Sequence, residues 1–516
     1  MAVPPPKTLA WLTGSLALLV LAWLSPRAVP FNMDELVHYH ALGCATAPLQ
    51  RELPLIRDGC RYHDLRLPFT ETWLPLRSYL YTGSFPALPF YPFWRLLDDP
   101  VSARVQGAVF FILVVLMATR LLRVRPSSVV LAALVYPLFL VTFLVDEGPV
   151  GLSAVLLLVA LLAVHRALAA EGTRSSAAWA AVAGFALFLG LWTKLVFAWW
   201  LPAVVAFAGA EARAGEGGWR TAGHRRAMLA GGAALVLPTV FLLASVDREG
   251  RPYAAVLRQG RVSAEREQVQ AAAGRLTPYL VDGSRVAPRN VLLTPSPLDP
   301  LPLVLTAGIL LLGARRSERR RAIAAWTAVA ALTFALASSS QYSQWPHHFA
   351  FPLLFLVLSL ALALDGSSPR TRRGTAALVL LFWTSLAVRW PAAVFPGESS
   401  PAKDELLRFV RTRRLDRGSL QLHASWGTYY IAQLFGDRDR LLLYMRSATD
   451  DPQRLETVRA LAEARGRGVL LVSSRRWEKI QNPAVAAALG PPLATWRFGD
   501  WWAVEYDPVR SSSPRP

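Results

Sequence analysis

Long apolar runs alternate with short polar segments over most of this chain, and a longer polar tail follows them. A helix that crosses a bilayer needs about 20 mainly apolar residues. The predicted fold class is therefore an all-α polytopic membrane protein. The pattern gives eleven candidate spans, near residues 8–26, 101–119, 127–145, 149–166, 176–193, 195–211, 227–245, 300–314, 322–339, 347–364 and 375–391.

The composition supports this class. Hydrophobic residues make up 53% of the 516 and charged residues only 17%, whereas soluble proteins carry about 25% charged residues. The net charge of +20 could indicate a nucleic-acid partner. Here the arginines lie in short loops between apolar runs, so the charge reflects membrane topology and no nucleic-acid partner is expected.

Arginine-rich loops orient the predicted helices, because short loops rich in Lys and Arg stay in the cytoplasm. Such loops follow every second span, starting with Arg120, Arg123 and Arg125. The first span is interpreted as a retained signal anchor, since Ser25-Pro26-Arg27 is a poor cleavage site. The expected location is the inner (cytoplasmic) membrane, with a cytoplasmic N-terminus and an external C-terminus.

The sequence predicts two domains. Residues 1–391 form the transmembrane domain, with external loops at 27–100 and 246–299, and residues 392–516 form a small extracytoplasmic α/β domain. The elements expected in this tail are a helix at 402–414, strands at 418–424 and 468–472, a helix from Asp451-Pro452, and a hairpin at 498–501.

The two long loops carry separate expectations. The aromatic stretch 88–94 is predicted to form a helix at the headgroup level. Cys44 and Cys60 lie together in the first loop, which favours a disulfide over two free thiols if that loop is external. The loop 246–299 is either a solvated connector or a lid over an external site.

Ionisable residues gather at the external ends of the predicted spans. Asp34 and Glu35 follow the first span and Asp146 and Glu147 the third; Lys194 follows the fifth, and His347 and His348 open the tenth. Each fits an ordinary solvated or interfacial residue when taken singly. Taken together, they are all predicted at the same depth of the membrane. This arrangement indicates a reaction that transfers a group from an anionic lipid, in which a carboxylate acts as the base and a cation offsets the charge of the leaving phosphate.

No glycine-rich phosphate loop stands between a predicted strand and helix, and no Cys/His cluster has zinc-site spacing. An ATP-driven pump, a nicotinamide enzyme and a structural zinc are therefore not expected. A second carboxylate could orient the acceptor or hold a divalent metal, and this choice stays open.

The motifs resemble those of the GT-C integral-membrane glycosyltransferases, and most closely the family 39-like branch of protein O-mannosyltransferases and lipid A aminoarabinose transferases. Their order and spacing match over roughly residues 8–365. The stretches that carry the resemblance are Asp34-Glu35-Leu36-Val37-His38, Asp146 before Gly148-Pro149, Gly190-Leu191-Trp192-Thr193-Lys194, and His347-His348-Phe349-Ala350-Phe351-Pro352.

The resemblance implies a GT-C fold, a polyprenyl-phosphate sugar donor, an external active site and inversion at the anomeric carbon. By the same resemblance Asp34 is the general base with Glu35 beside it. Asp146, Glu147 and His38 position acceptor or donor, and Lys194, His347 and His348 bind the lipid phosphate. Relatives often have Arg-Tyr in place of His347-His348, and the missing charge would then come from Arg77, Arg95 or Arg104.

The resulting hypothesis is a cell-envelope glycosyltransferase that moves a sugar from a lipid-linked donor to an extracytoplasmic glycan, lipid or protein. Two alternatives stay open. A transporter or flippase of a lipid-linked substrate would place charges deep in the spans and contain broken helices or an internal repeat. A non-catalytic assembly subunit with a GT-C-like fold would tolerate loss of Asp34.

Overall fold

The structure is a computed structural model. Apart from isolated positions between 267 and 281, the residues it describes are 38–39, 41–42, 64–66, 73–75, 77–79, 82–97, 101–144, 149–214, 222–247, 294–316, 318–339, 346–389, 405–406, 408–409, 420–423, 442–444, 452–464, 468–474, 483–499 and 501–507. The chain divides into two compact units. The first comprises Met1–Val29 and Leu80–Pro396, and the second comprises Pro30–Tyr79 and Gly397–Pro516.

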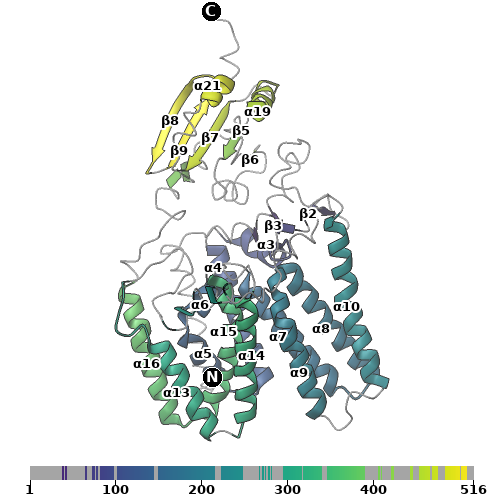
Figure 1. The fold of residues 1–516 in the computed structure, drawn as a ribbon. Coiled ribbons are helices and arrows are strands. Elements are labelled where there is room, and N and C mark those ends of the chain that lie inside the picture. The colour runs from purple at the N-terminus through teal and green to yellow at the C-terminus, as the bar shows by residue number, and fades with distance from the viewer. Residues whose placement is uncertain are drawn as a thin grey trace, which may run out of the picture. The chain divides into compact units, whose positions relative to one another are not determined.

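The first unit is built almost wholly of helices (Figure 1). Five of its described helical stretches are long and apolar enough to cross a membrane, or six if one bent pair counts as a span. Its elements in chain order are β4 (Thr82–Gly83), α3 (Ala87–Leu96), α4 (Val101–Leu122), α5 (Pro126–Val135), α6 (Pro137–Leu144), α7 (Val150–Ala169), α8 (Thr173–Thr193), the 3-10 helix η3 (Leu195–Trp200), α9 (Leu201–Ala214), α10 (Ala222–Asp247), α13 (Leu301–Arg316), α14 (Arg320–Ser338), the 3-10 helix η6 (Pro346–Phe349), α15 (Ala350–Asp365) and α16 (Pro369–Arg389).

Helices occupy each of the predicted span ranges from residue 101 onward. Not all of them meet the length and hydropathy expected of a span, however, because α10, α13 and α15 contain only shorter apolar stretches. The first predicted span, 8–26, lies outside the described residues. The count of eleven spans therefore stays a prediction, as does a domain boundary at residue 391.

The predicted span 127–145 is not one straight helix. It is divided at Tyr136 into α5 and α6, which are bent by 103° relative to each other. Pro137 explains the break, because proline lacks a backbone N–H and disfavours helical geometry in the residue before it. Tyr136 has extended backbone geometry, and its buried hydroxyl lies 2.8 Å from that of Thr306.

The core of the first unit surrounds α15, which is buried along nearly its whole length. Aromatic rings from several helices pack on it. The Trp200 and Phe351 ring centroids are 4.5 Å apart, and Trp326 stacks on Phe355 at 5.7 Å. By contrast, α10 packs mainly on α8, beside which it runs in Figure 1.

The second unit contains a five-stranded mixed sheet with the order β6-β5-β7-β9-β8. The first three strands are parallel, and β9 and β8 continue the sheet antiparallel. Helices α19 and α21 contribute to one buried cluster with Leu420, Leu471 and Val504. The elements are β1 (Asp64–Arg66), β2 (Trp73–Pro75), β3 (Arg77–Tyr79), β5 (Leu420–His423), β6 (Leu442–Tyr444), α19 (Pro452–Ala464), β7 (Val469–Ser474), α21 (Pro483–Leu489), β8 (Pro492–Phe498) and β9 (Trp501–Tyr506).

Several local predictions coincide with observed elements. The helix expected from Asp451-Pro452 is α19, and the strands expected at 418–424 and 468–472 are β5 and β7. The predicted hairpin joins β8 to β9, with Gly499 at a positive φ of 57°. The aromatic stretch 88–94 lies in the helix α3. The hairpin of β1 and β2 was not predicted, because each strand is only three residues long.

A bidentate ion pair joins the end of α16 to the turn before α13. Arg389 Nη2 lies 2.8 Å from Asp299 Oδ1, Arg389 Nη1 lies 3.3 Å from Oδ2, and both side chains are nearly buried. Breaking a buried pair leaves the remaining charge uncompensated. Arg389→Gln is therefore expected to lower stability by about 3 kcal/mol, seen as an earlier thermal unfolding transition of the purified protein.

Arg373→Gln is the matched control, since it removes an exposed arginine from the same helix. The double variant Arg389→Gln/Asp299→Asn should recover part of the loss. An unfolding transition for Arg389→Gln that equals the wild-type one would show that the pair does not hold α16 in place.

Candidate functional site

The structure describes the side chains of five predicted site residues. Arg95 is exposed, and the other four are buried: His38 is 3% exposed, Arg104 0%, Lys194 2% and His348 0%. Arg104, Lys194 and His348 belong to the first unit, whereas His38 belongs to the second. Arg77 lies in β3 and His347 in η6, where only the backbone is described. Asp34, Glu35, Asp146, Glu147, Cys44 and Cys60 lie outside the described residues, so their predicted roles and the disulfide stay predictions.

Lys194 sits where α8 breaks into the 3-10 helix η3. Its backbone is extended, its N–H donates to the Gly190 carbonyl at 3.0 Å, and its carbonyl accepts from the Phe197 N–H at 2.9 Å. A Cβ on Gly190 would overlap the Phe197 ring, so glycine at this position lets η3 fold back on the end of α8. The motif glycine thus positions the lysine at a helix break.

The segment before α3 crosses the end of α8. The backbone of Gly83 packs against the Trp192 carbonyl so closely that no Cβ could fit, and the Phe85 and Trp192 rings lie 5.5 Å apart. The next residue, Ser84, is fully buried. This packing encloses the end of α8, which bears Lys194.

His348 packs against η3. Its ring meets Trp199 edge-on at 5.4 Å and Phe351 at 6.3 Å. The indole N–H of Trp200 donates to the Phe351 carbonyl at 3.1 Å, which fixes η3 against the start of α15. Both predicted phosphate-binding residues thus adjoin η3, Lys194 directly before its first residue and His348 against Trp199 near its end.

Arg104 occupies the first turn of α4. It lies about 10 Å along the helix from Phe111, whose ring contacts Phe143 near the end of α6 at 5.5 Å. The described end of α6, which precedes Asp146, therefore packs against α4 about 10 Å along the helix axis from Arg104. Arg95, the other described candidate for the missing charge, is exposed on α3, so burial favours Arg104 for this role.

Sequence reasoning missed several buried polar residues near these cations, namely Ser84, Ser102 and Gln106. Within the described part of the chain, the buried hydroxyls of Ser84 and Ser102 make no hydrogen bond. A buried hydroxyl without a partner costs free energy, so a ligand or water that bonded to it would be favoured. For Ser102 and Gln106 the available signal was a polar run at the start of a predicted span, since such residues are rare in membranes.

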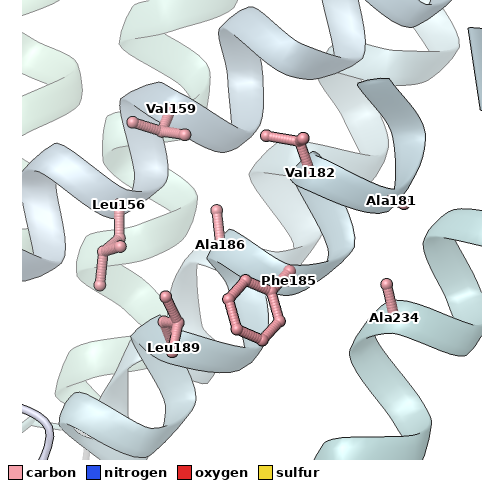
Figure 2. Close-up of a pocket in the computed structure, with 8 residues that line it drawn as sticks. All are labelled: Leu156, Val159, Ala181, Val182, Phe185, Ala186, Leu189 and Ala234. Carbon is pink, nitrogen blue, oxygen red and sulfur yellow. The ribbon is translucent and has the colours of Figure 1, made fainter. Parts of the chain in front are cut away.

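An apolar groove of about 410 Å³ lies on the helical unit between α7, α8 and α10 (Figure 2). Its lining is entirely hydrocarbon, from Leu156, Val159, Ala181, Val182, Phe185, Ala186, Leu189 and Ala234. Three aromatic rings on α8 lie in a row from the groove toward Lys194. Phe185 lies 5.8 Å from Phe188, which stacks on Trp192 at 5.9 Å. The groove and the buried lysine thus share the helix α8.

The chemistry of this region suits an anion. Buried cations act in a low-dielectric environment, where they attract a phosphate more strongly than they would in water. Among the residues that the structure describes, no three His, Cys, Asp or Glu side chains are grouped as a metal site. The predicted carboxylates are outside that set, so the metal requirement stays open.

The long apolar helices define a multi-pass membrane protein. No family model and no curated protein sequence matches the chain. Solved structures do match: ArnT from Cupriavidus metallidurans bound to undecaprenyl phosphate has a TM-score of 0.60 at 15% identity, covering 98% of this chain and 99% of that one. The apo state of the same ArnT gives 0.57 at 14% identity, covering 98% and 100%.

The oligosaccharyltransferase of Archaeoglobus fulgidus is more distant, with a TM-score of 0.40 at 13% identity over 89% of this chain and 68% of that one. The ArnT match extends over nearly the whole length of both chains. The chain therefore has the ArnT fold, and the predicted resemblance to GT-C enzymes is confirmed at the level of the fold.

Proposed function

We propose that this protein is a membrane glycosyltransferase that takes a sugar from a polyprenyl-phosphate donor. The observation that carries the proposal is the match in fold to ArnT with undecaprenyl phosphate bound. The buried cations Arg104 and Lys194, with two buried serine hydroxyls close in sequence to the elements that bear them, supply groups suited to a lipid phosphate. The acceptor lies on the external side in the predicted orientation.

The proposed reaction is a single displacement with inversion. The Asp34 carboxylate takes the proton of an acceptor hydroxyl, whose oxygen forms a bond to the anomeric carbon. The bond between that carbon and the phosphate oxygen breaks, and polyprenyl phosphate leaves with the electron pair. Lys194 and Arg104 offset the charge that develops on the leaving phosphate. Glu35, Asp146, Glu147 and His38 orient acceptor or donor, and His347 and His348 complete the phosphate site.

The groove between α7, α8 and α10 would take the lipid chain of the donor. Along the axis of α8 the groove begins at Leu189, about 8 Å before Lys194, and extends past Phe185, and its wholly apolar lining suits an isoprenoid. Val182 is exposed and lines the groove. We expect Val182→Trp to fill it and weaken undecaprenyl phosphate binding about tenfold, measured by equilibrium binding to purified protein in nanodiscs.

Two controls sharpen this experiment. Geranyl phosphate, with two isoprene units, is too short to reach Val182, about 18 Å along the helix from Lys194, and should bind the variant and the wild type equally. Val240→Trp adds the same ring at an exposed position of α10 that does not line the groove, and should bind undecaprenyl phosphate normally. If wild-type protein binds no undecaprenyl phosphate, the proposed function fails; if Val182→Trp binds it normally, only the placement of the chain fails.

The bend between α5 and α6 is a described feature that a transporter would also predict. The polar groups at the bend are the hydroxyls of Tyr136 and Thr306, which bond to each other. Neither carries a charge to guide a phosphate, so the bend gives transport little support. Changing Asp34 distinguishes the enzyme from a non-catalytic assembly subunit, because only the subunit would tolerate the loss of this carboxylate.

A further inference from the structure

Four helix ends meet at a single carboxylate on the arginine-rich end of the first unit. Asp365, the last residue of α15, accepts hydrogen bonds through Oδ1 from the backbone N–H and Nε of Arg125, at 3.0 and 2.8 Å. Its Oδ2 lies 3.6 Å from Arg319 Nη1. Arg372 Nη1 donates to the backbone carbonyls of Asp365 at 3.4 Å and Ser367 at 2.8 Å. Two guanidinium groups thus contact one carboxylate, and a third binds backbone carbonyls beside it.

The charge in this cluster is not balanced. Burial alone would raise the pKa of Asp365, but hydrogen bonds and charge from Arg125, together with the charge of Arg319, lower it, so the carboxylate stays ionised. Burial and the neighbouring charge of Arg125 lower the pKa of Arg372, and the negative charge of Asp365 raises it by less. Asp365 and the dipole at the end of α15 offset part of the positive charge, and an excess of about two charges remains by this count.

The surrounding sequence adds to the excess. The segments 123–125, 318–321 and 365–373 hold eight arginines and two acids, Glu318 and Asp365. Helices α5, α14 and α16 also begin here, and a helix N-terminus attracts anions. The Arg319 guanidinium donates to the Arg123 carbonyl at 3.3 Å, which joins the first two segments.

We propose that the Arg125–Arg319–Arg372 cluster binds the phosphate of an anionic phospholipid headgroup. Topology alone requires only that arginines lie in these loops; it does not require three of them to converge on one residue, two on its carboxylate and one on its backbone carbonyl. A phosphodiester would supply the missing negative charge and accept charge-assisted hydrogen bonds. The cluster lies at the ends of apolar helices, where headgroups of the bilayer are the anions at hand. This site is independent of the proposed glycosyl transfer.

The test uses the full chain reconstituted in vesicles of equal phosphatidylglycerol and phosphatidylcholine, then counts the retained lipids by native mass spectrometry. Wild-type protein should retain phosphatidylglycerol in clear excess. Arg372→Gln should lower that retention about tenfold. Arg373→Gln is the matched control, with the same loss of charge one residue along the helix, and should change retention little. Asp365→Asn removes the competing carboxylate and should raise retention, an effect that misfolding would not produce.

Three results would overturn the proposal. Equal retention of the two lipids by the wild type would mean that no headgroup site exists. If Arg372→Gln and Arg373→Gln lost phosphatidylglycerol retention equally, the general positive charge of the loops would explain the retention, and no specific site would be needed. Displacement of phosphatidylglycerol by millimolar inorganic phosphate would assign the cluster to free phosphate instead of a lipid. Thermal unfolding in phosphatidylcholine alone checks that each variant is folded.

Discussion

Asp34→Asn should reduce sugar transfer by about 10²- to 10⁴-fold, the usual contribution of a general base. The amide has nearly the same size as the carboxylate but cannot take the acceptor proton. Donor binding should be kept, because the proposed phosphate contacts come from other residues. The measurement is the rate of sugar transfer in membranes, at matched expression of the variant and wild type.

Glu35→Gln is the neighbouring control for this variant. It makes the same chemical change one residue along the chain, and the account expects a smaller loss because Glu35 orients a substrate without accepting the proton. Unchanged transfer in Asp34→Asn, with the protein inserted and folded, would remove Asp34 as the base. Loss in Glu35→Gln alone would move the role to Glu35.

Lys194→Gln should reduce kcat/KM by about 10²-fold, the cost of removing one preorganised group that stabilises developing negative charge. The residue is buried at the break between α8 and η3, so a cation there acts on the leaving phosphate with little screening by water. Binding of undecaprenyl phosphate should weaken as well. Initial rates and equilibrium binding separate the two effects.

Arg120→Gln provides the comparison for Lys194→Gln. It removes one positive charge from an exposed position in the last turn of α4, so transfer and lipid binding should stay at wild-type levels. Normal kcat/KM in folded Lys194→Gln would exclude the lysine from the phosphate site. Arg104 would then be the remaining buried arginine or lysine proposed to bind the lipid phosphate.

The sequence predicted the type of each element, helix or strand, better than any other aspect of the fold. Runs of apolar residues such as 149–166 and 176–193 predicted α7 and α8, because length and hydropathy together decide what a bilayer accepts. The bend before Pro137 was not visible, since proline occurs in membrane helices and the flanking residues stay apolar through the break. The three-residue strands β1 and β2 are too short to show an alternating pattern.

The roles of the candidate site residues stay predictions, and the structure describes the positions of only some of them. Gly190 and Lys194 lie where the motif suggested, but only the structure shows why the glycine is needed, namely the ring of Phe197 packed over it. Sequence could not distinguish exposed Arg95 from buried Arg104 as a source of charge. The ion pair of Asp299 with Arg389 joins positions ninety residues apart, and no local pattern reports such a contact.

The most direct test of the proposed activity is a transfer assay with purified protein in proteoliposomes. A set of polyprenyl-phosphate donors, each labelled on both sugar and lipid, is supplied with cell-envelope extract as acceptor. The account predicts that one donor passes its sugar label to the extract and releases one polyprenyl phosphate for each sugar moved. Intact donor that crosses to the opposite leaflet, with no sugar transferred from any donor, would contradict the account and indicate a transporter.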